Sequence, residues 1–551
     1  MRRSSLPSDI DAVELESLVQ DEEEGEMTLA PDAPLSMRPP FSPRPSSLSL
    51  RPKWLTHDHL PWYQRLAHVG ASSAILFLWP RFTWRYVLCA SLALYALYCS
   101  VRQSPLFAYP LPTYEGGPYG VGVIDIEIPL PDGPKRISDA VLRRSGEPAF
   151  DVETVLVSLY YPTNRAFQSS QSRYYWVPKP ISLTAEGYAK VAHIDNFITR
   201  PIFTFFLWAI AGSVTIPAEV NAPLFDEGGD QGSSSQFPVI IFSHGMASSR
   251  TDYTNFLGEL ASRGSIIAAV EHRDGSCPGS MIKHPGEDGE GRRRLYIGES
   301  DLAGDGMNTP EFKRIQLAFR DVEMLAAIDM LRSINDGSGL AYIAANNTRS
   351  PSASTLSTWP SRLDIDKRLI IAGHSYGATG ALQALTTIAP GAAAGLILDP
   401  GKSSGPLNHN STAPLLIIHS NSWSRSHSIF YGRPHFDTVR DLVRAQPAPS
   451  WFLTSLGTSH PSVTDAPLLE PLLLSWTTGA NLDVKGALKQ YVNVSQEFLD
   501  FSMHGKLNNL VGLLAEDITH EEYNVWVSDE RKKTFPKSLA KLWEIHVTPE
   551  V

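Results

Sequence analysis

One stretch of this sequence restricts the possible folds more than any other. Residues 369–372 are apolar and lead into Gly-His-Ser-Tyr-Gly at residues 373–377, and a segment rich in alanine and leucine follows. This order predicts a β-strand, a sharp turn that carries Ser375, and an α-helix. The small residues beside the serine allow strand and helix to approach closely, and the turn holds the serine in a strained backbone conformation. Because G-x-S-x-G also occurs by chance, the alternative is a tight turn with an incidental serine.

The remainder of the chain from about residue 116 has the pattern of an α/β domain. Short β-branched runs alternate with helical patterns, which is typical of a mostly parallel sheet flanked by helices. Apolar residues at helical spacing predict one long helix over residues 312–334. The predicted strands cover residues 155–160, 239–242, 265–270, 368–372, 395–398, 414–418 and 451–456. Together with the serine turn, this pattern predicts an α/β-hydrolase fold.

A serine hydroxyl is a weak nucleophile that needs a general base, and the base needs an acid to orient it. In this fold the three residues follow the order serine, acid, histidine. Asp399 directly follows the run 395–398 and is the expected acid; Asp437 is the reserve, and an aspartate that caps a turn is the alternative. His460 lies in a loop just past the run 451–456 and is the expected base. The rival histidines precede that last strand: His419, His427 and His435.

The oxyanion formed by such a nucleophile needs two backbone N–H donors. One is expected to be the N–H of Tyr376, directly after the nucleophile. The other is expected from the loop after residues 237–242, where His244-Gly245-Met246 follows an apolar run. Gly245 lets the backbone turn inward, so the Met246 N–H is the second predicted donor. The His244 side chain is interpreted as a packed support.

Composition narrows the possible partners. The 551 residues carry a formal net charge of −11, which argues against a nucleic-acid partner held by phosphate contacts. The chain has three cysteines, Cys89, Cys99 and Cys277, and only the last lies outside an apolar N-terminal segment. A cysteine metal cluster is therefore excluded, and the expected chemistry requires no metal and no cofactor.

The chain before the α/β region divides into two predicted parts. Residues 1–60 are acidic and then rich in proline and serine, which predicts a disordered tail. Residues 61–104 form a predicted membrane-anchor region with a transmembrane helix over 86–101, flanked by Arg85 and Arg102. A buried or surface-lying helix is the alternative. Residues 105–551 are the predicted catalytic domain.

The cations around the predicted helix indicate its orientation. Most of them precede it, which predicts a single-pass protein with a cytosolic N-terminus and a lumenal or extracellular catalytic domain. Three glycosylation sequons, which begin at Asn346, Asn410 and Asn493, fit that side but also arise by chance.

Several short blocks occur in collinear order over about residues 116–465. They are GPYGVG at 117–122, LYYP at 159–162, WVP at 176–178, FSHGM at 242–246, AAVEHRD at 268–274, GHSYG at 373–377, Leu398-Asp399 and the His460 loop. These blocks resemble the platelet-activating factor acetylhydrolases, which are calcium-independent lipase-like serine hydrolases. The resemblance implies an esterase of the 1-alkyl-2-acetylglycerophosphocholine type that removes short or oxidised sn-2 acyl groups from phospholipids. It also implies the same five residues: Ser375, Asp399, His460, Met246 and Tyr376.

An aromatic, uncharged block over residues 201–210 resembles the segment through which that family touches lipid surfaces. The residues expected to contact lipid or substrate are Phe203, Phe205, Phe206, Leu207 and Trp208, and a buried core helix is the alternative. The chain departs from the family pattern at three places: Pro400 after the acid, Ala378-Thr379 after the turn that carries Ser375, and a polar insert near Asp226. Two other functions stay open: a general carboxylesterase or lipase, and a catalytically silent, membrane-tethered binding protein.

Overall fold

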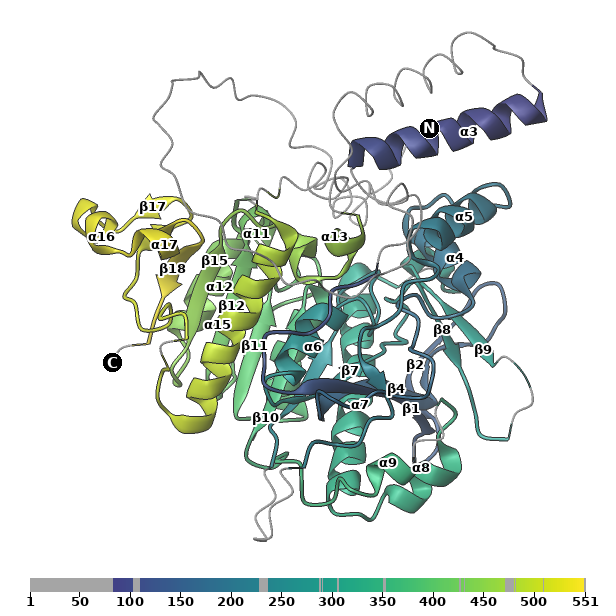
Figure 1. Cartoon of the computed structure of the whole chain (residues 1–551), viewed down its shortest axis with the longest axis horizontal. Helices are drawn as coiled ribbons and strands as arrows, with labels where there is room; N and C mark the ends of the chain where they lie inside the picture. Colours follow the sequence, from purple (N-terminus) through teal and green to yellow (C-terminus); the bar gives the residue numbers. More distant parts are fainter. Residues whose placement is uncertain are drawn as a thin grey trace, which may run out of the picture. The chain divides into compact units, whose positions relative to one another are not determined.

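The structure is a computed structural model that describes residues 83–102 and 110–549, apart from 227–235, 287–288, 290, 305–306, 350–352, 426–427, 431, 471–479, 481 and 509. The chain divides into two compact units, Met1–Tyr109 and Pro110–Val551. In the first unit the described element is helix α3 (Trp84–Arg102) (Figure 1). The predicted disordered tail, residues 1–60, lies outside the described residues.

Helix α3 covers the predicted transmembrane segment but does not meet the requirements of a span. It has 19 residues, with Arg85 and Arg102 near its two ends and tyrosines and serines among the apolar residues between them. A spanning helix needs about 20 predominantly apolar residues. Among the described residues, none of the helices combines the length and the apolar character that a membrane crossing demands. The predicted single-pass anchor is therefore wrong, and so is the predicted orientation that depended on it.

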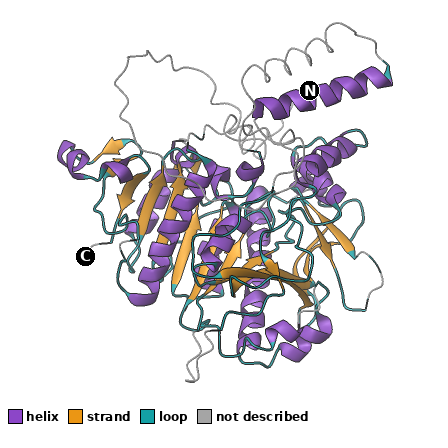
Figure 2. Ribbon diagram, in the orientation of Figure 1, coloured by secondary structure: helices purple, strands orange, loops and turns teal. Residues whose placement is uncertain are grey.

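The second unit is built on a ten-stranded sheet with the order β18-β15-β12-β11-β10-β6-β7-β4-β1-β5 (Figure 2). Its centre is parallel, whereas β4 and β18 pair antiparallel with their neighbours on the inside of the sheet. Every predicted strand run forms one of these strands. The strands are β1 (Gly120–Pro129), β4 (Thr154–Thr163), β5 (Glu219–Val220), β6 (Val239–Ser243), β7 (Ile266–Val270), β10 (Leu369–His374), β11 (Ala394–Leu398), β12 (Leu415–Ser420), β15 (Trp451–Ser455) and β18 (Trp543–Val547).

Four two-stranded sheets complete the strand inventory of the described residues. They pair β2 (Lys135–Val141) with β3 (Pro148–Val152), β8 (Gly279–Ile282) with β9 (Arg292–Leu295), β13 (Ile429–Phe430) with β14 (Arg433–Pro434), and β16 (His520–Glu522) with β17 (Val525–Trp526).

Helices cover both faces of the large sheet. Because side chains alternate along a strand, Ile241 of β6 packs into one core with helices α7, α10 and α12, whereas Phe242 packs into a second core with α6 and α15. Figure 1 shows α6 and α15 on the same side of the sheet. The helices are α4 (Ile181–Val191), α5 (Thr199–Ala211), α6 (Thr254–Ala261), α7 (Thr309–Asn335), α8 (Leu340–Asn346), α9 (Ala353–Leu356), α10 (Tyr376–Thr387), α11 (Asn421–Arg425), α12 (His435–Arg444), α13 (Ala466–Leu469), α15 (Val484–His504), α16 (Asp529–Thr534) and α17 (Lys537–Ala540), with short 3₁₀ helices η2 (Glu299–Asp301) and η3 (His460–Val463).

This topology determines where polar side chains can gather. The carboxyl ends of parallel strands meet at one edge of the sheet, where open α/β sheets hold their sites. Ser375 follows β10, Asp399 follows β11, and His460 lies a few residues beyond β15. Gly245 lies just past β6, which pairs with β10. All of these residues therefore come from the same edge.

Candidate active site

Ser375 occupies a strained turn between β10 and α10. Its backbone has φ 55° and ψ −124°, a region that residues other than glycine rarely adopt. Its N–H donates to the carbonyl of Leu398 at 2.9 Å, and its carbonyl accepts from the N–H of Ala378 at 2.9 Å. A side chain at Gly377 would collide with the carbonyl of Ser243 on β6, so the close approach of strand and helix depends on that glycine. These contacts hold Ser375 in its unusual conformation.

Asp399 and His460 are brought together by a hydrogen bond. The Nδ1 of His460 lies 2.9 Å from Oδ2 of Asp399, whose side chain is buried. Ser420, at the end of β12, donates to the same carboxylate from its N–H at 2.6 Å and from its hydroxyl at 2.7 Å. The backbone N–H of His460 donates to Oγ of Ser422 at 3.1 Å. The carboxylate is therefore fixed by two donors of Ser420, and it faces one ring nitrogen of the histidine.

The loop after β6 lies directly against the serine turn. A Cβ on Gly245 would lie 3.1 Å from the Cβ of Ser375. The N–H of Gly245 donates to the hydroxyl of Tyr253 at 3.1 Å, and the same hydroxyl lies 2.8 Å from Nδ1 of His374. Tyr253 therefore links this loop to the residue before Ser375. Met246, which carries the predicted oxyanion donor, follows in this loop and is half-buried.

Tyr376, the other predicted oxyanion donor, is the first residue of α10. Its N–H belongs to the first turn of the helix, where amides have no acceptor within the helix and the helix dipole favours negative charge. Its buried side chain donates from the hydroxyl to the carbonyl of Lys313 at 3.2 Å and to Oε1 of Gln316 at 3.1 Å. Helix α7 thus holds this end of the turn in place.

Arg320 of α7 supports the site from beneath, and sequence reasoning missed it. Its guanidinium is fully buried, lies 4.4 Å from the ring centroid of Tyr376 and donates to the carbonyl of His244 at 2.7 Å. It also pairs with Asp274 at 2.9 Å and donates to Ser276 at 2.6 Å. A charged residue among the apolar positions of a predicted helix was the available signal. Arg320 therefore connects the loop after β6 with the serine turn.

The other histidines considered in the sequence have different environments. His244 is buried, accepts from the N–H of His272 at 3.0 Å, and burial lowers its pKa to about 4, which fits the predicted supporting role. His419 and His435 stack on each other at 5.4 Å, and burial lowers the pKa of His435 to about 3. The reserve acid Asp437 instead pairs with Arg440 at 2.8 Å on α12. The remaining rival, His427, lies outside the described residues.

Among the described residues, one cluster could offer three metal ligands. The ligand atoms of His374, Asp399 and His460 lie within 4.8 Å of one another. Two of the three share the hydrogen bond described above, and Asp399 accepts two more from Ser420. These hydrogen bonds occupy most lone pairs of the Asp399 carboxylate, so few remain for a cation. The arrangement suits a carboxylate that orients an imidazole.

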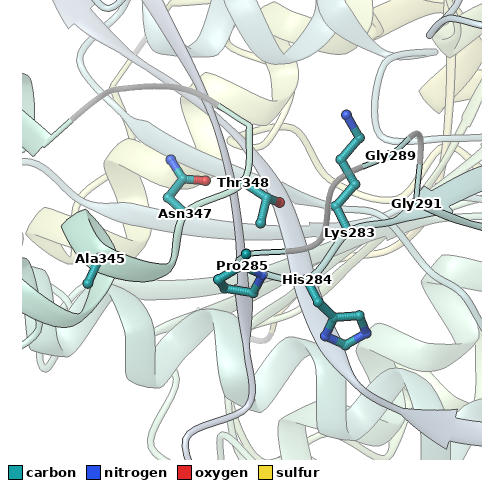
Figure 3. A pocket seen from close by; sticks show the side chains of 9 residues that line it. Lys283, His284, Pro285, Gly289, Gly291, Ala345, Asn347 and Thr348 are labelled. Carbon is teal, nitrogen blue, oxygen red and sulfur yellow. The ribbon is translucent and has the colours of Figure 1, made fainter.

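A separate pocket of about 320 Å³ is lined by residues from the segments 283–291 and 345–348, the described ones of which are drawn in Figure 3. Lys283, His284, Asn347 and Thr348 are among its lining residues, and it shares none with the site at Ser375. His284 pairs with Glu153 at 3.0 Å, and Oδ1 of Asn347 accepts from a backbone N–H of β1. These polar groups serve the fold itself.

Comparison with known proteins relates this chain to lipid hydrolases. A platelet-activating factor acetylhydrolase from Cavia porcellus is 28% identical over 49% of this chain and 51% of the relative. A putative phospholipase A2 from Schizosaccharomyces pombe (strain 972 / ATCC 24843) is 26% identical over 51% of this chain and 58% of the relative. The platelet-activating factor acetylhydrolase from Canis lupus familiaris is 28% identical over 41% and 46%. The chain therefore spans about half the length of the curated relatives it matches.

A solved ferulic acid esterase from Streptomyces cinnamoneus aligns with a TM-score of 0.45 and 18% identity over 73% of this chain and 94% of its own. The family model described as platelet-activating factor acetylhydrolase, isoform II matches residues 112–518, which is most of the chain. The collinear blocks recognised in the sequence lie within that match. This chain belongs to the platelet-activating factor acetylhydrolase isoform II family.

Proposed function

We propose that this protein hydrolyses acyl esters of phospholipids with Ser375 as nucleophile, His460 as general base and Asp399 as the orienting acid. The observation that carries the proposal is the 2.9 Å hydrogen bond between His460 and Asp399 beside a serine at φ 55°. The family supports a lipid-ester substrate. Residues 105–551 form the catalytic domain in this proposal.

The proposed reaction is a two-step acyl transfer. The Ser375 oxygen bonds to the ester carbonyl carbon as its proton passes to Nε2 of His460. Asp399 accepts from Nδ1–H, which fixes the tautomer that leaves Nε2 free to take the proton. The backbone amides of Met246 and Tyr376 receive the oxyanion. His460 then returns the proton to the leaving alcohol, and water releases the acyl group by the same sequence.

The proposed substrate is a phospholipid with a short or oxidised sn-2 acyl group. Two of the relatives above carry the name platelet-activating factor acetylhydrolase and one is named a putative phospholipase A2. Purified protein is expected to hydrolyse an acetyl phospholipid faster than a long-acyl one, with or without chelator. Faster turnover of long-chain lipid or of triacylglycerol would instead assign a general lipase, and loss of activity in chelator would refute the metal-free mechanism.

The nucleophile has a direct test. Ser375→Ala is expected to lower turnover by about 10⁶, as in other enzymes of this mechanism. A fluorophosphonate probe is expected to label the wild type and not the variant. An unlabelled wild-type protein would favour a catalytically silent binding protein, and near-normal activity of Ser375→Ala would overturn the assignment.

Helix α5 supports the proposed contact with a lipid surface. Phe205, Phe206 and Trp208 are 49%, 47% and 53% exposed, whereas Phe203 and Leu207 are half-buried. The exposed apolar surface continues into the preceding turn, where Phe197 is 86% exposed. An apolar face of this kind can insert into the boundary between headgroups and acyl chains. We propose that α5 and this turn rest on the surface that holds the substrate.

Vesicle binding tests this surface. Replacing Phe206 and Trp208 with serine is expected to reduce flotation with phosphatidylcholine vesicles and to raise the apparent KM on vesicle substrate, with hydrolysis of a water-soluble ester unchanged. Replacing Leu510 with serine removes an apolar side chain that is also 51% exposed and serves as the matched control. Equal flotation of both variants and the wild type would refute the proposal.

A further inference from the structure

The imidazole of His460 is stacked on an indole that no sequence argument identified. The ring of Trp423 lies 3.9 Å from that of His460, centroid to centroid, with only 9° between the two planes. A second ring, that of His374, lies 4.5 Å from the same imidazole. The orientation of His460 is therefore set by the hydrogen bond to Asp399 and by aromatic packing.

Trp423 is itself held by the segments that carry the acid. It lies on α11, directly after β12, and is buried. Its Nε1–H donates to the carbonyl of Pro400 at 3.0 Å, and Pro400 is the residue after Asp399. Its backbone N–H lies 3.4 Å from the hydroxyl of Ser420, which also donates to Asp399. The indole, the carboxylate and the imidazole are thus connected by hydrogen bonds and one ring contact.

We propose that Trp423 is a positioning residue for the reaction at Ser375. Its indole face keeps the His460 ring parallel to itself, and it stabilises the imidazolium that forms when His460 takes the serine proton. This inference rests on the proposed function. The face of an indole carries the negative part of the ring quadrupole and attracts a cation more strongly than the face of phenylalanine does. The neutral imidazole gains less from the same contact, so the stabilisation acts mainly once the proton has moved.

The charged and titratable groups around His460 determine the sign of the expected effect. Asp399 favours the imidazolium. Lys402 disfavours the imidazolium, because its positive ammonium already lies over the same indole, 4.3 Å from the centroid of the Trp423 ring. Burial holds the pKa of His374 well below its usual value, so this neighbour stays neutral. Burial also lowers the pKa of His435, which packs edge-on against Trp423 from α12. On α15, burial raises the pKa of Tyr491 near Asp399, which keeps this phenol uncharged.

The test uses the full chain and a soluble short-chain sn-2 ester, with kcat and KM measured from pH 5 to 9. Loss of a partly desolvated cation–π contact corresponds to about 2- to 30-fold in rate. Trp423→Leu is therefore expected to lower kcat by about that factor with little change in KM, and to move the acid limb of the kcat/KM profile to lower pH. Trp423→Phe keeps an aromatic face and is expected to give a smaller change in the same direction. Lys402→Met removes the opposing cation and is expected to move the limb to higher pH.

The control is Trp526→Leu. Trp526 also packs on a histidine, His520 at 4.2 Å, but lies on the β16–β17 hairpin. This variant is expected to leave the profile unchanged. If Trp423→Leu lowers kcat without moving the acid limb, or if Trp423→Phe behaves as the wild type in both respects, Trp423 only packs and the inference is wrong. If the wild type is not labelled by a fluorophosphonate, the proposed function fails instead, and the two failures are distinguishable.

Discussion

Ser375 can be replaced by two residues that both lack a nucleophile but differ in how they tolerate its backbone. At φ 55° and ψ −124°, a residue with a Cβ stores about 1–3 kcal/mol of strain, whereas glycine adopts this region freely. Glycine also loses more conformational entropy on folding than alanine, by about 0.5–1 kcal/mol. Taking the middle of each range, the difference predicts that Ser375→Gly is about 1 kcal/mol more stable than Ser375→Ala, although glycine is normally the weaker choice.

Urea unfolding of the two variants measures this difference, and activity assays confirm that both lack turnover. Ser182 provides the matched control, because it is exposed and lies in helix α4. There the order should reverse, with alanine more stable than glycine. If Ser375→Ala proved as stable as Ser375→Gly while the Ser182 pair behaved normally, the turn would carry no strain and the argument for a nucleophile elbow would lose its physical basis.

Three further predictions concern the support of the site. Gly377→Ala is expected to yield little folded protein, because its methyl group would collide with the carbonyl of Ser243; the soluble yield and circular dichroism would show this. Arg320→Met is expected to lower the free energy of unfolding, measured in urea, by about 3–5 kcal/mol, because Asp274 stays buried without its counter-charge. Adding Asp274→Asn to this variant should recover part of that loss. Burial raises the pKa of Asp465 to about 7, above about 3.9 in the unfolded chain. The protonated carboxyl therefore stabilises the folded state fully below about pH 4, and this stabilisation is lost as pH rises through 7. The stability of the wild type relative to Asp465→Asn should therefore fall with rising pH by up to about 1.4 kcal/mol per unit, and an unchanged difference between pH 4.5 and 7.5 would contradict this.

The sequence predicted the parts of the fold that depend on local pattern. The buried central strands are continuous apolar runs, so β6, β10 and β11 were recognisable, and the order of Ser375, Asp399 and His460 followed from the topology. Strands β1, β5 and β18 of the large sheet were not predicted; they lie toward its two ends, and β5 has only two residues.

The supports of the site were not predictable, because they are contacts between distant segments. Arg320 lies on α7, Trp423 lies on α11 and Tyr253 directly precedes α6, and nothing in their local sequence indicates which strand end each of them reaches. The membrane prediction failed for a different reason. Residues 86–101 are uncharged, but an uncharged run that contains tyrosines and serines is not as apolar as a spanning helix must be.

The position of β10 in the sheet has a consequence for how such chains can diverge. The reacting groups follow β10, β11 and β15, and β6 and β12 supply neighbouring support, so all come from adjacent strands in one half of the sheet. The far margin, formed by β4, β1 and β5, includes exposed connections such as the turn 143–147 between β2 and β3. Lengthening a surface connection costs little free energy, since loop entropy grows only slowly with length. Insertions at that margin can therefore accumulate between relatives while the chemistry stays the same.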